Sequence, residues 1–239
     1  HRDLHSFPTR RSSDLYAVYT FLQDYLDCRW YAPDEEKIPL KSDLSINPID
    51  FKYVPQIHFR EYFCLGATAP IFSAKLRLNG REFMSDIPLE YGGNVRMGGA
   101  HTLFNTFVKP SEHFEQHPEW YAWRQKEEKR VEAQLCMTNP QVQQQVLEEV
   151  LKYLEDEYSK MPAYHKWVSV SCPDNNTFCQ CENCADVIEK ENTPAGPLIE
   201  LVNFVAKGVK ESYPDVCINT LAYWRSEERR VGKECRSRW

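Results

Sequence analysis

Apolar residues recur with the period of an α-helix in three long stretches of the chain. The first is Tyr16–Leu26, where they fall close to the i, i+3, i+4 and i+7 positions of one helix face. The second begins at Asn139 and Pro140, because asparagine caps helices and proline fits their first turn. The third is Pro197–Tyr213. The inward stripe of the second stretch is Val142, Val146, Val150, Leu151, Leu154 and Tyr158. That of the third stretch is Leu198, Leu201, Val202, Val205 and Val209.

Short apolar runs between turn residues predict strands. Ile38–Ile49 alternates apolar residues but contains two prolines, which favours an edge strand and linker. Ile71–Leu78 favours a short helix, and Val54-Pro55 is the predicted domain boundary. From about residue 130 strands alternate with long helices, so we expect an α/β fold with a parallel sheet. The predicted strands are Cys28–Ala32, Ile57–Cys64, Asn94–Gly98, Gln134–Met137, Trp167–Ser171 and Val216–Tyr223.

The two ends of the chain are related to each other at the level of DNA. If Ser237, Arg238 and Trp239 are written as the codons TCT CGG TGG, the complementary strand C CAC CGA GA encodes His1 and Arg2. We therefore interpret residues 1–15 and 225–239 as a sequencing adapter translated in both directions, and leave both out of fold reasoning. The native segment is then 16–224.

Removing the two end segments changes the charge of the chain. The whole chain has a formal net charge of -6, and the end segments together carry +4, which leaves -10 for residues 16–224. An acidic chain argues against nucleic acid as a partner. No apolar run reaches about 18 residues, so no transmembrane helix is predicted.

Polar residues that follow predicted strands are the candidate site, because α/β folds bind ligands at the carboxyl ends of parallel strands. Asp174 follows Trp167–Ser171 and is the strongest candidate. A carboxyl group just past a buried strand can be partly desolvated, as a general acid requires. The alternative is an Asx-turn that caps the loop. Arg60 and Glu61 lie in another predicted strand, and Tyr223 ends the last one.

Two further stretches carry histidine. Gly98-Gly99-Ala100-His101 lacks the spacing of a phosphate loop, so its glycines serve either a turn or a close backbone approach. His117-Pro118-Glu119-Trp120-Tyr121 combines charged and aromatic groups, which suits sugar binding. An ordinary loop with a half-buried tryptophan is the alternative.

Three cysteines form a CxCxxC cluster at Cys179, Cys181 and Cys184. They could hold a structural zinc ion with a fourth ligand such as Asp174, Asp186 or a histidine. A disulfide between two of them is the alternative in an exported protein. The isolated cysteines are expected to be buried free thiols: Cys28, Cys64, Cys136, Cys172 and Cys217.

Several of these stretches together resemble bacterial alpha-glucuronidase-like proteins. Those proteins carry a small N-terminal domain similar to that of family 67 glycoside hydrolases, followed by a domain expected to be a TIM-barrel hydrolase. The stretches are YAVYTFLQDYLDCRWYAPDEEKIP, FREYF, KLRLNG, GGAHTLF, HPEWYAW, QLCMTNP, VSVSCPDNNTFCQCENC and NTLAY.

The resemblance implies a layout and a site. Residues 16–53 would end a small α/β domain, and 54–224 would form an incomplete (β/α)8 barrel of about five strands. Asp174 would follow the fourth strand as acid or substrate anchor, and a second carboxylate would come from later strands. Arg60 would suit a sugar carboxylate. The substrate-binding set would be Arg60, Glu61, His101, His117, Glu119, Asn175 and Tyr223.

The resemblance therefore predicts a glycoside hydrolase that acts on glycans, with uronic-acid-bearing glycans as candidates, and an exported full-length protein. No cofactor is required for this chemistry, and structural zinc at the CxCxxC cluster is the one candidate metal. The rival interpretations are a carbohydrate-binding protein without catalysis and a metal-dependent protein.

Overall fold

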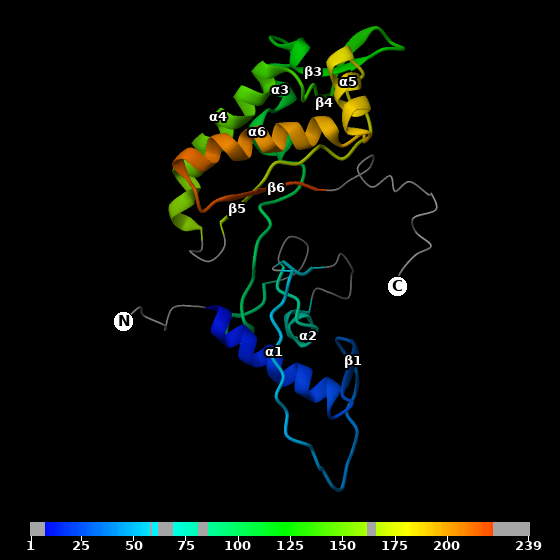
Figure 1. Ribbon diagram of the computed structural model, residues 1–239, viewed down its shortest axis with the longest axis vertical. Helices are drawn as coiled ribbons and strands as arrows, with labels where there is room; N and C mark the ends of the chain where they lie inside the picture. The colour runs from blue at the N-terminus through cyan, green and yellow to red at the C-terminus, as the bar shows by residue number, and fades with distance from the viewer. Residues whose placement is uncertain (1–7, 58, 62–68, 81–85, 162–165, 222–239) are drawn as a thin grey trace. The chain divides into compact units, whose positions relative to one another are not determined.

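The computed structural model describes residues 8–57, 59–61, 69–80, 86–161 and 166–221. The chain divides into two compact units, His1–Met97 and Gly98–Trp239 (Figure 1). This division falls well after Val54-Pro55, the predicted domain boundary, which stays a prediction. Cys64 and Tyr223 lie outside the described residues.

The first unit contains two helices and a small hairpin. Helix α1 (Pro8–Asp24) confirms the predicted helix but begins eight residues earlier, inside the segment interpreted as adapter. Strand β1 (Arg29–Ala32) pairs antiparallel with β2 (Glu35–Lys37). Helix α2 (Pro70–Lys75) confirms the predicted short helix. A 3₁₀ turn, η2 (Leu89–Tyr91), follows.

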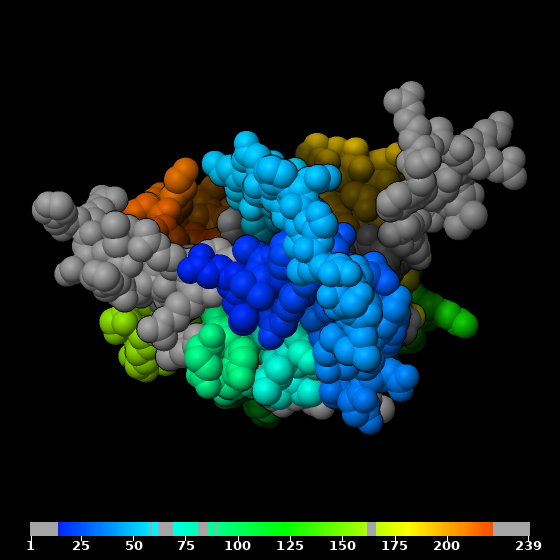
Figure 2. Space-filling model, turned by 90° about the horizontal axis from the view of Figure 1, so that it is seen from below, coloured from blue at the N-terminus to red at the C-terminus, as the bar shows by residue number. Residues whose placement is uncertain are grey.

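The predicted edge strand at Ile38–Ile49 is wrong. These residues have no regular secondary structure, and the apolar side chains along them are exposed, Leu40 completely. Figure 2 shows this light blue stretch open to view. Two prolines lack the N–H that a ladder needs, and no neighbouring strand pairs with the segment in the described part of the unit. Asn94–Gly98 is also not a strand, and neither are the described residues of Ile57–Cys64.

The second unit begins with short helical turns and a hairpin. The turns are η3 (Leu103–Phe107, π-helical), α3 (Pro110–His113) and η4 (Pro118–Trp120). Strand β3 (Tyr121–Arg124) pairs antiparallel with β4 (Lys129–Leu135). Strand β4 overlaps the predicted strand at Gln134–Met137, whereas β3 was not predicted.

The rest of the second unit alternates strands and helices as the sequence predicts. Helix α4 (Pro140–Glu157) runs into the turn η5 (Tyr158–Lys160) and is followed by β5 (Trp167–Ser169). Helices α5 (Glu182–Glu191) and α6 (Gly196–Ser212) then lead to β6 (Cys217–Asn219). Strands β5 and β6 are parallel, which confirms that part of the prediction.

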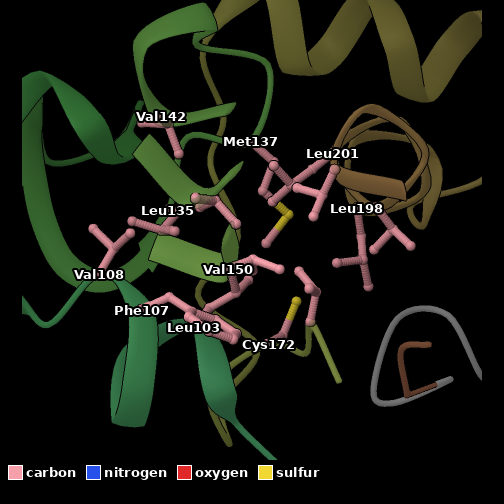
Figure 3. Packing of buried hydrophobic residues seen from close by; sticks show 14 of the residues in the cluster. Leu103, Phe107, Val108, Leu135, Met137, Val142, Val150, Cys172, Leu198 and Leu201 are labelled. Atoms are coloured by element: carbon pink, nitrogen blue, oxygen red, sulfur yellow. The ribbon is translucent and has the colours of Figure 1, made fainter. Parts of the chain in front are cut away.

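The core of the second unit is built on the predicted helix stripes. The Asn139 side chain accepts a hydrogen bond from the backbone N–H of Gln141 at 2.9 Å and so caps α4. The buried stripe of α4 faces that of α6, and the β4–β5 region fills the space beside them (Figure 3). Members include Val142, Val146, Val150, Leu154, Leu198, Leu201, Val205 and Val209.

The fold is therefore mixed α/β. In the part of the chain that the structure describes, the strands form three two-stranded sheets, and no barrel is present among them. None of the helices described is long and apolar enough to cross a bilayer. Cys28 and Cys172 are buried as predicted, whereas Cys217 is exposed, since the first residue of a short strand need not face the core.

Candidate functional site

The chain buries β5 and its continuation and then turns outward at Asp174. Val170, Ser171 and Cys172 are buried, and Asp174 is exposed. Asn175 follows at intermediate exposure. Two predicted site residues therefore lie where a parallel strand gives way to a loop.

The loop after β5 is held by the buried side chain of Gln134 on β4. Its Nε2 donates to the backbone oxygens of Pro173 and Asn175, both at 3.1 Å, and lies 3.2 Å from Asn175 Oδ1. The Asn175 Nδ2 in turn donates to Ala133 O at 2.8 Å. The Asx-type contact of the loop is made by Asn175, whose Oδ1 accepts from Thr177 N at 3.0 Å. The loop conformation is thus fixed from β4.

The glycine-histidine stretch lies against the same loop. His101 Nδ1 is 2.7 Å from the backbone oxygen of Cys172. Thr102 Oγ1 donates to Ser169 O at 2.6 Å and accepts from Ser171 N at 3.0 Å. A Cβ on Gly98 would stand 2.8 Å from the Ser169 backbone nitrogen. Gly98 therefore permits a close approach of the backbone to strand β5, and His101 lies beside the candidate loop.

The HPEWY stretch is folded inward. Trp120 and Tyr121 are buried, and burial raises the pKa of Tyr121 to about 12. The ring of His117 stacks on Trp120 with centroids 4.2 Å apart, and His117 Nδ1 lies 3.2 Å from Glu119 Oε1. Both aromatic rings belong to the hydrophobic core, with Trp120 more deeply buried than the half-buried tryptophan of the loop alternative, whereas His117 and Glu119 remain at the surface.

Arg60 and Glu61 belong to the first compact unit. The Arg60 guanidinium donates to Arg77 O at 2.9 Å and to Ile57 O at 2.7 Å, and stands 5.6 Å from the Tyr16 ring centroid. Glu61 packs against Gly80. Their predicted role in substrate binding stays a prediction.

A fourth cysteine joins the CxCxxC cluster. The Sγ atoms of Cys136, Cys179, Cys181 and Cys184 all lie within 4.8 Å of one another, and all but Cys181 are buried. Cys136 follows β4 directly, Cys181 is the N-cap of α5, and Cys184 lies in the first turn of α5. No two of the described cysteines form a disulfide. Asp174, Asp186 and histidine, the predicted fourth ligands, are not in the cluster.

Hydrogen bonds within the cluster favour one thiolate. The thiols of Cys179 and Cys184 lower the pKa of Cys136 by hydrogen bonding to it, although its burial acts in the opposite direction. The same contacts raise the pKa of Cys184 and raise that of Cys179 to about 11. These contacts therefore favour the ionised form of Cys136 over the ionised forms of Cys179 and Cys184.

The cavity between the cysteine cluster and α6 is not a sugar site. Its volume is about 20 Å³, and Phe178, Cys179 and Leu198 are among its lining residues. That space holds about one water molecule, whereas pockets for small organic ligands measure roughly 300–1,000 Å³.

One family model matches residues 30–231, and its description is "Domain of unknown function (DUF4838)". The chain belongs to the DUF4838 family. The match includes most of both compact units, with the loop after β5 and all four clustered cysteines, and it extends into the C-terminal segment interpreted as adapter. No curated protein and no solved structure matches the DUF4838 chain.

Sequence reasoning missed two residues that organise the site of this DUF4838 domain. Cys136 was assigned to the isolated buried thiols because it lies 43 residues before Cys179, and no local spacing links them. Gln134 was only the first residue of the predicted strand Gln134–Met137 and was given no role. The sequence did show a polar residue, Gln134, within an apolar run and a further cysteine, Cys136, close to it. Neither signal indicates which distant residues the side chain contacts.

Proposed function

We propose that the DUF4838 domain is part of a glycoside hydrolase and that Asp174 is its general acid or substrate anchor. The observation that carries the proposal is the position of Asp174. It lies on the loop that leaves the carboxyl end of β5, in a parallel pair whose strands are joined through α5 and α6. Ligands of α/β folds bind at this end of the strands.

The resemblance to alpha-glucuronidase-like proteins gives this position its chemistry. In that layout β5 and β6 would be the fourth and fifth strands of a (β/α)8 barrel, and an acidic residue follows the fourth strand. The hydrogen bonds from Gln134 to the loop support the proposal, because a catalytic group works best on a backbone that its neighbours hold in place. Asn175 on the loop itself and His101, whose Nδ1 lies 2.7 Å from Cys172 O just before the loop, are the candidates for substrate contacts beside Asp174.

The test uses the full-length gene product, because the proposed mechanism needs a second carboxylate that we expect from later strands. The substrates are a panel of 4-nitrophenyl glycosides and glucuronic-acid-bearing xylo-oligosaccharides. Asp174→Asn should reduce turnover by about 10²-fold or more if Asp174 is the acid. Asp156→Asn, on the exposed face of α4, is the matched control and should retain turnover.

Near-normal turnover of Asp174→Asn would contradict the acid role. Binding of the oligosaccharides without hydrolysis by the wild-type protein would favour the rival proposal of a carbohydrate-binding protein. In that case Asp174→Asn should weaken binding, which calorimetry measures.

A further inference from the structure

The four clustered cysteines have the spacing of a tetrahedral metal site. Zinc–sulfur bonds of about 2.3 Å at tetrahedral angles place the ligand atoms about 3.8 Å apart. The sulfurs here lie within 4.8 Å of one another, and those of Cys136 and Cys181 are 3.6 Å apart. We propose that Cys136, Cys179, Cys181 and Cys184 bind one zinc ion in a closed, structural site. This inference does not depend on the proposed hydrolase.

The donor set selects the kind of metal and the kind of site. Four soft thiolates suit zinc, whereas calcium, magnesium and manganese prefer oxygen ligands. Four protein ligands also leave no position for water or substrate, so the ion would hold the fold together instead of taking part in a reaction. Three of the ligands come from the C-x-C-x-x-C stretch, and Cys136 is brought to them by β4.

Groups around the cluster are placed to stabilise negative sulfur atoms. The Trp123 backbone N–H donates to Cys179 Sγ at 3.3 Å, and Arg130 Nη1 lies 3.9 Å from the same sulfur. Thr138 Oγ1 is 3.1 Å from Cys184 Sγ and can donate to it. The first turn of α5 contributes the positive end of the helix dipole. A tetrathiolate site carries excess negative charge, and such outer partners are what it requires.

Packing gives the site a structural purpose. The four cysteines belong to a small hydrophobic core that is separate from the main one. The buried residues of this small core are Cys136, Cys179, Cys184 and Ala122. So little apolar surface stabilises a hairpin weakly, because burial contributes only about 25 cal/mol per Å². A zinc ion would supply that stability by joining the end of β4 to the start of α5. Along the chain, the loop that carries Asp174 lies between β5 and the start of α5, where the zinc ion would bind.

The experiment measures metal in the chain as it stands. The chain is purified under reducing conditions without chelator or metal-affinity resin, and its metals are quantified by plasma mass spectrometry. We expect one zinc ion per chain, retained in Cys217→Ser, the matched control at an exposed cysteine outside the cluster. Serine at any of the four cluster positions should reduce the bound zinc to well below one ion after dialysis against a competing chelator.

Cobalt substitution keeps the proposal testable if the serine variants fail to fold. Cobalt in the wild-type chain should give the intense visible and thiolate charge-transfer bands of a tetrahedral sulfur site. Cys136→His should still bind one ion. Its charge-transfer band should be weaker than in the wild type, because one of the four thiolate ligands has been replaced.

Four outcomes would overturn the assignment. One is a folded, reduced chain that binds neither zinc nor cobalt. Another is an unchanged cobalt spectrum in Cys136→His, which would remove Cys136 from the ligand set. The third is iron in place of zinc, and the fourth is an intact mass that shows a disulfide within the cluster.

Discussion

The amide nitrogen of Gln134 donates to the backbone oxygen of Asn175 at 3.1 Å, and the Gln134 side chain is completely buried. This contact links an antiparallel hairpin to the loop that leaves the parallel strand pair. The two residues are 41 positions apart in sequence. The shape of the candidate loop is therefore set largely by a side chain from another element.

Replacing Gln134 should destabilise the second unit. Gln134→Ala would leave the backbone oxygens of Pro173, in a buried contact, and of Asn175, in a partly buried one, without this donor, and a buried polar group left unsatisfied costs about 1–3 kcal/mol. We expect the free energy of unfolding to fall by about 2 kcal/mol in urea titrations. Gln144→Ala on the exposed face of α4 is the control and should change it by less than about 0.5 kcal/mol. Equal effects of the two substitutions would show that the contact is not stabilising.

Gly98 and Gly99 should respond differently to alanine. Both have positive φ, so an alanine at either position costs about 1–2 kcal/mol. At Gly98 the added Cβ would also stand 2.8 Å from the backbone nitrogen of Ser169, whereas at Gly99 the nearest atom is 3.6 Å away. Gly98→Ala should therefore lower the midpoint of thermal unfolding clearly more than Gly99→Ala. The reverse order would contradict the close approach to β5.

The sequence predicted secondary structure correctly where the residues that specify an element lie within that element. Helices α4 and α6 were predictable because a cap or proline and an apolar stripe lie within each stretch. The parallel relation of β5 and β6 followed from their long helical connection. Ile38–Ile49 misled because alternation of apolar residues does not create a partner strand. Strand β3 was missed because it is short and follows Pro118 closely.

The candidate site was predictable only in part, for the same reason. Asp174 and Asn175 were found because they follow a strand directly, and Cys179, Cys181 and Cys184 because they share a short motif. Gln134 and Cys136 were not found as site residues, because the hairpin that brings them to the loop depends on long-range packing. Periodicity describes one element at a time and does not specify such contacts.

Two cysteines outside the cluster should differ in reactivity. Burial raises the pKa of Cys172 to about 12, so almost none of it is thiolate at pH 8, and its sulfur is also shielded from solvent. Cys217 is exposed. Iodoacetamide at pH 8 should label Cys217 in the folded chain and leave Cys172 unmodified, as peptide mass spectrometry would show. Both should be labelled in guanidinium chloride, and rapid labelling of Cys172 without denaturant would contradict its burial.

Removing the Thr138 hydroxyl should weaken the proposed zinc site without removing a ligand. Thr138→Val keeps the shape of the side chain but deletes the group that lies 3.1 Å from Cys184 Sγ. Loss of such an outer partner typically costs about 10–100-fold in metal affinity. Competition with a chromophoric chelator would measure this loss, and Thr106→Val at an exposed position is the control, which should keep wild-type affinity. Equal zinc affinities in Thr138→Val and the wild type would mean that the hydroxyl does not support the sulfur, and that the contact between Thr138 and Cys184 is packing alone.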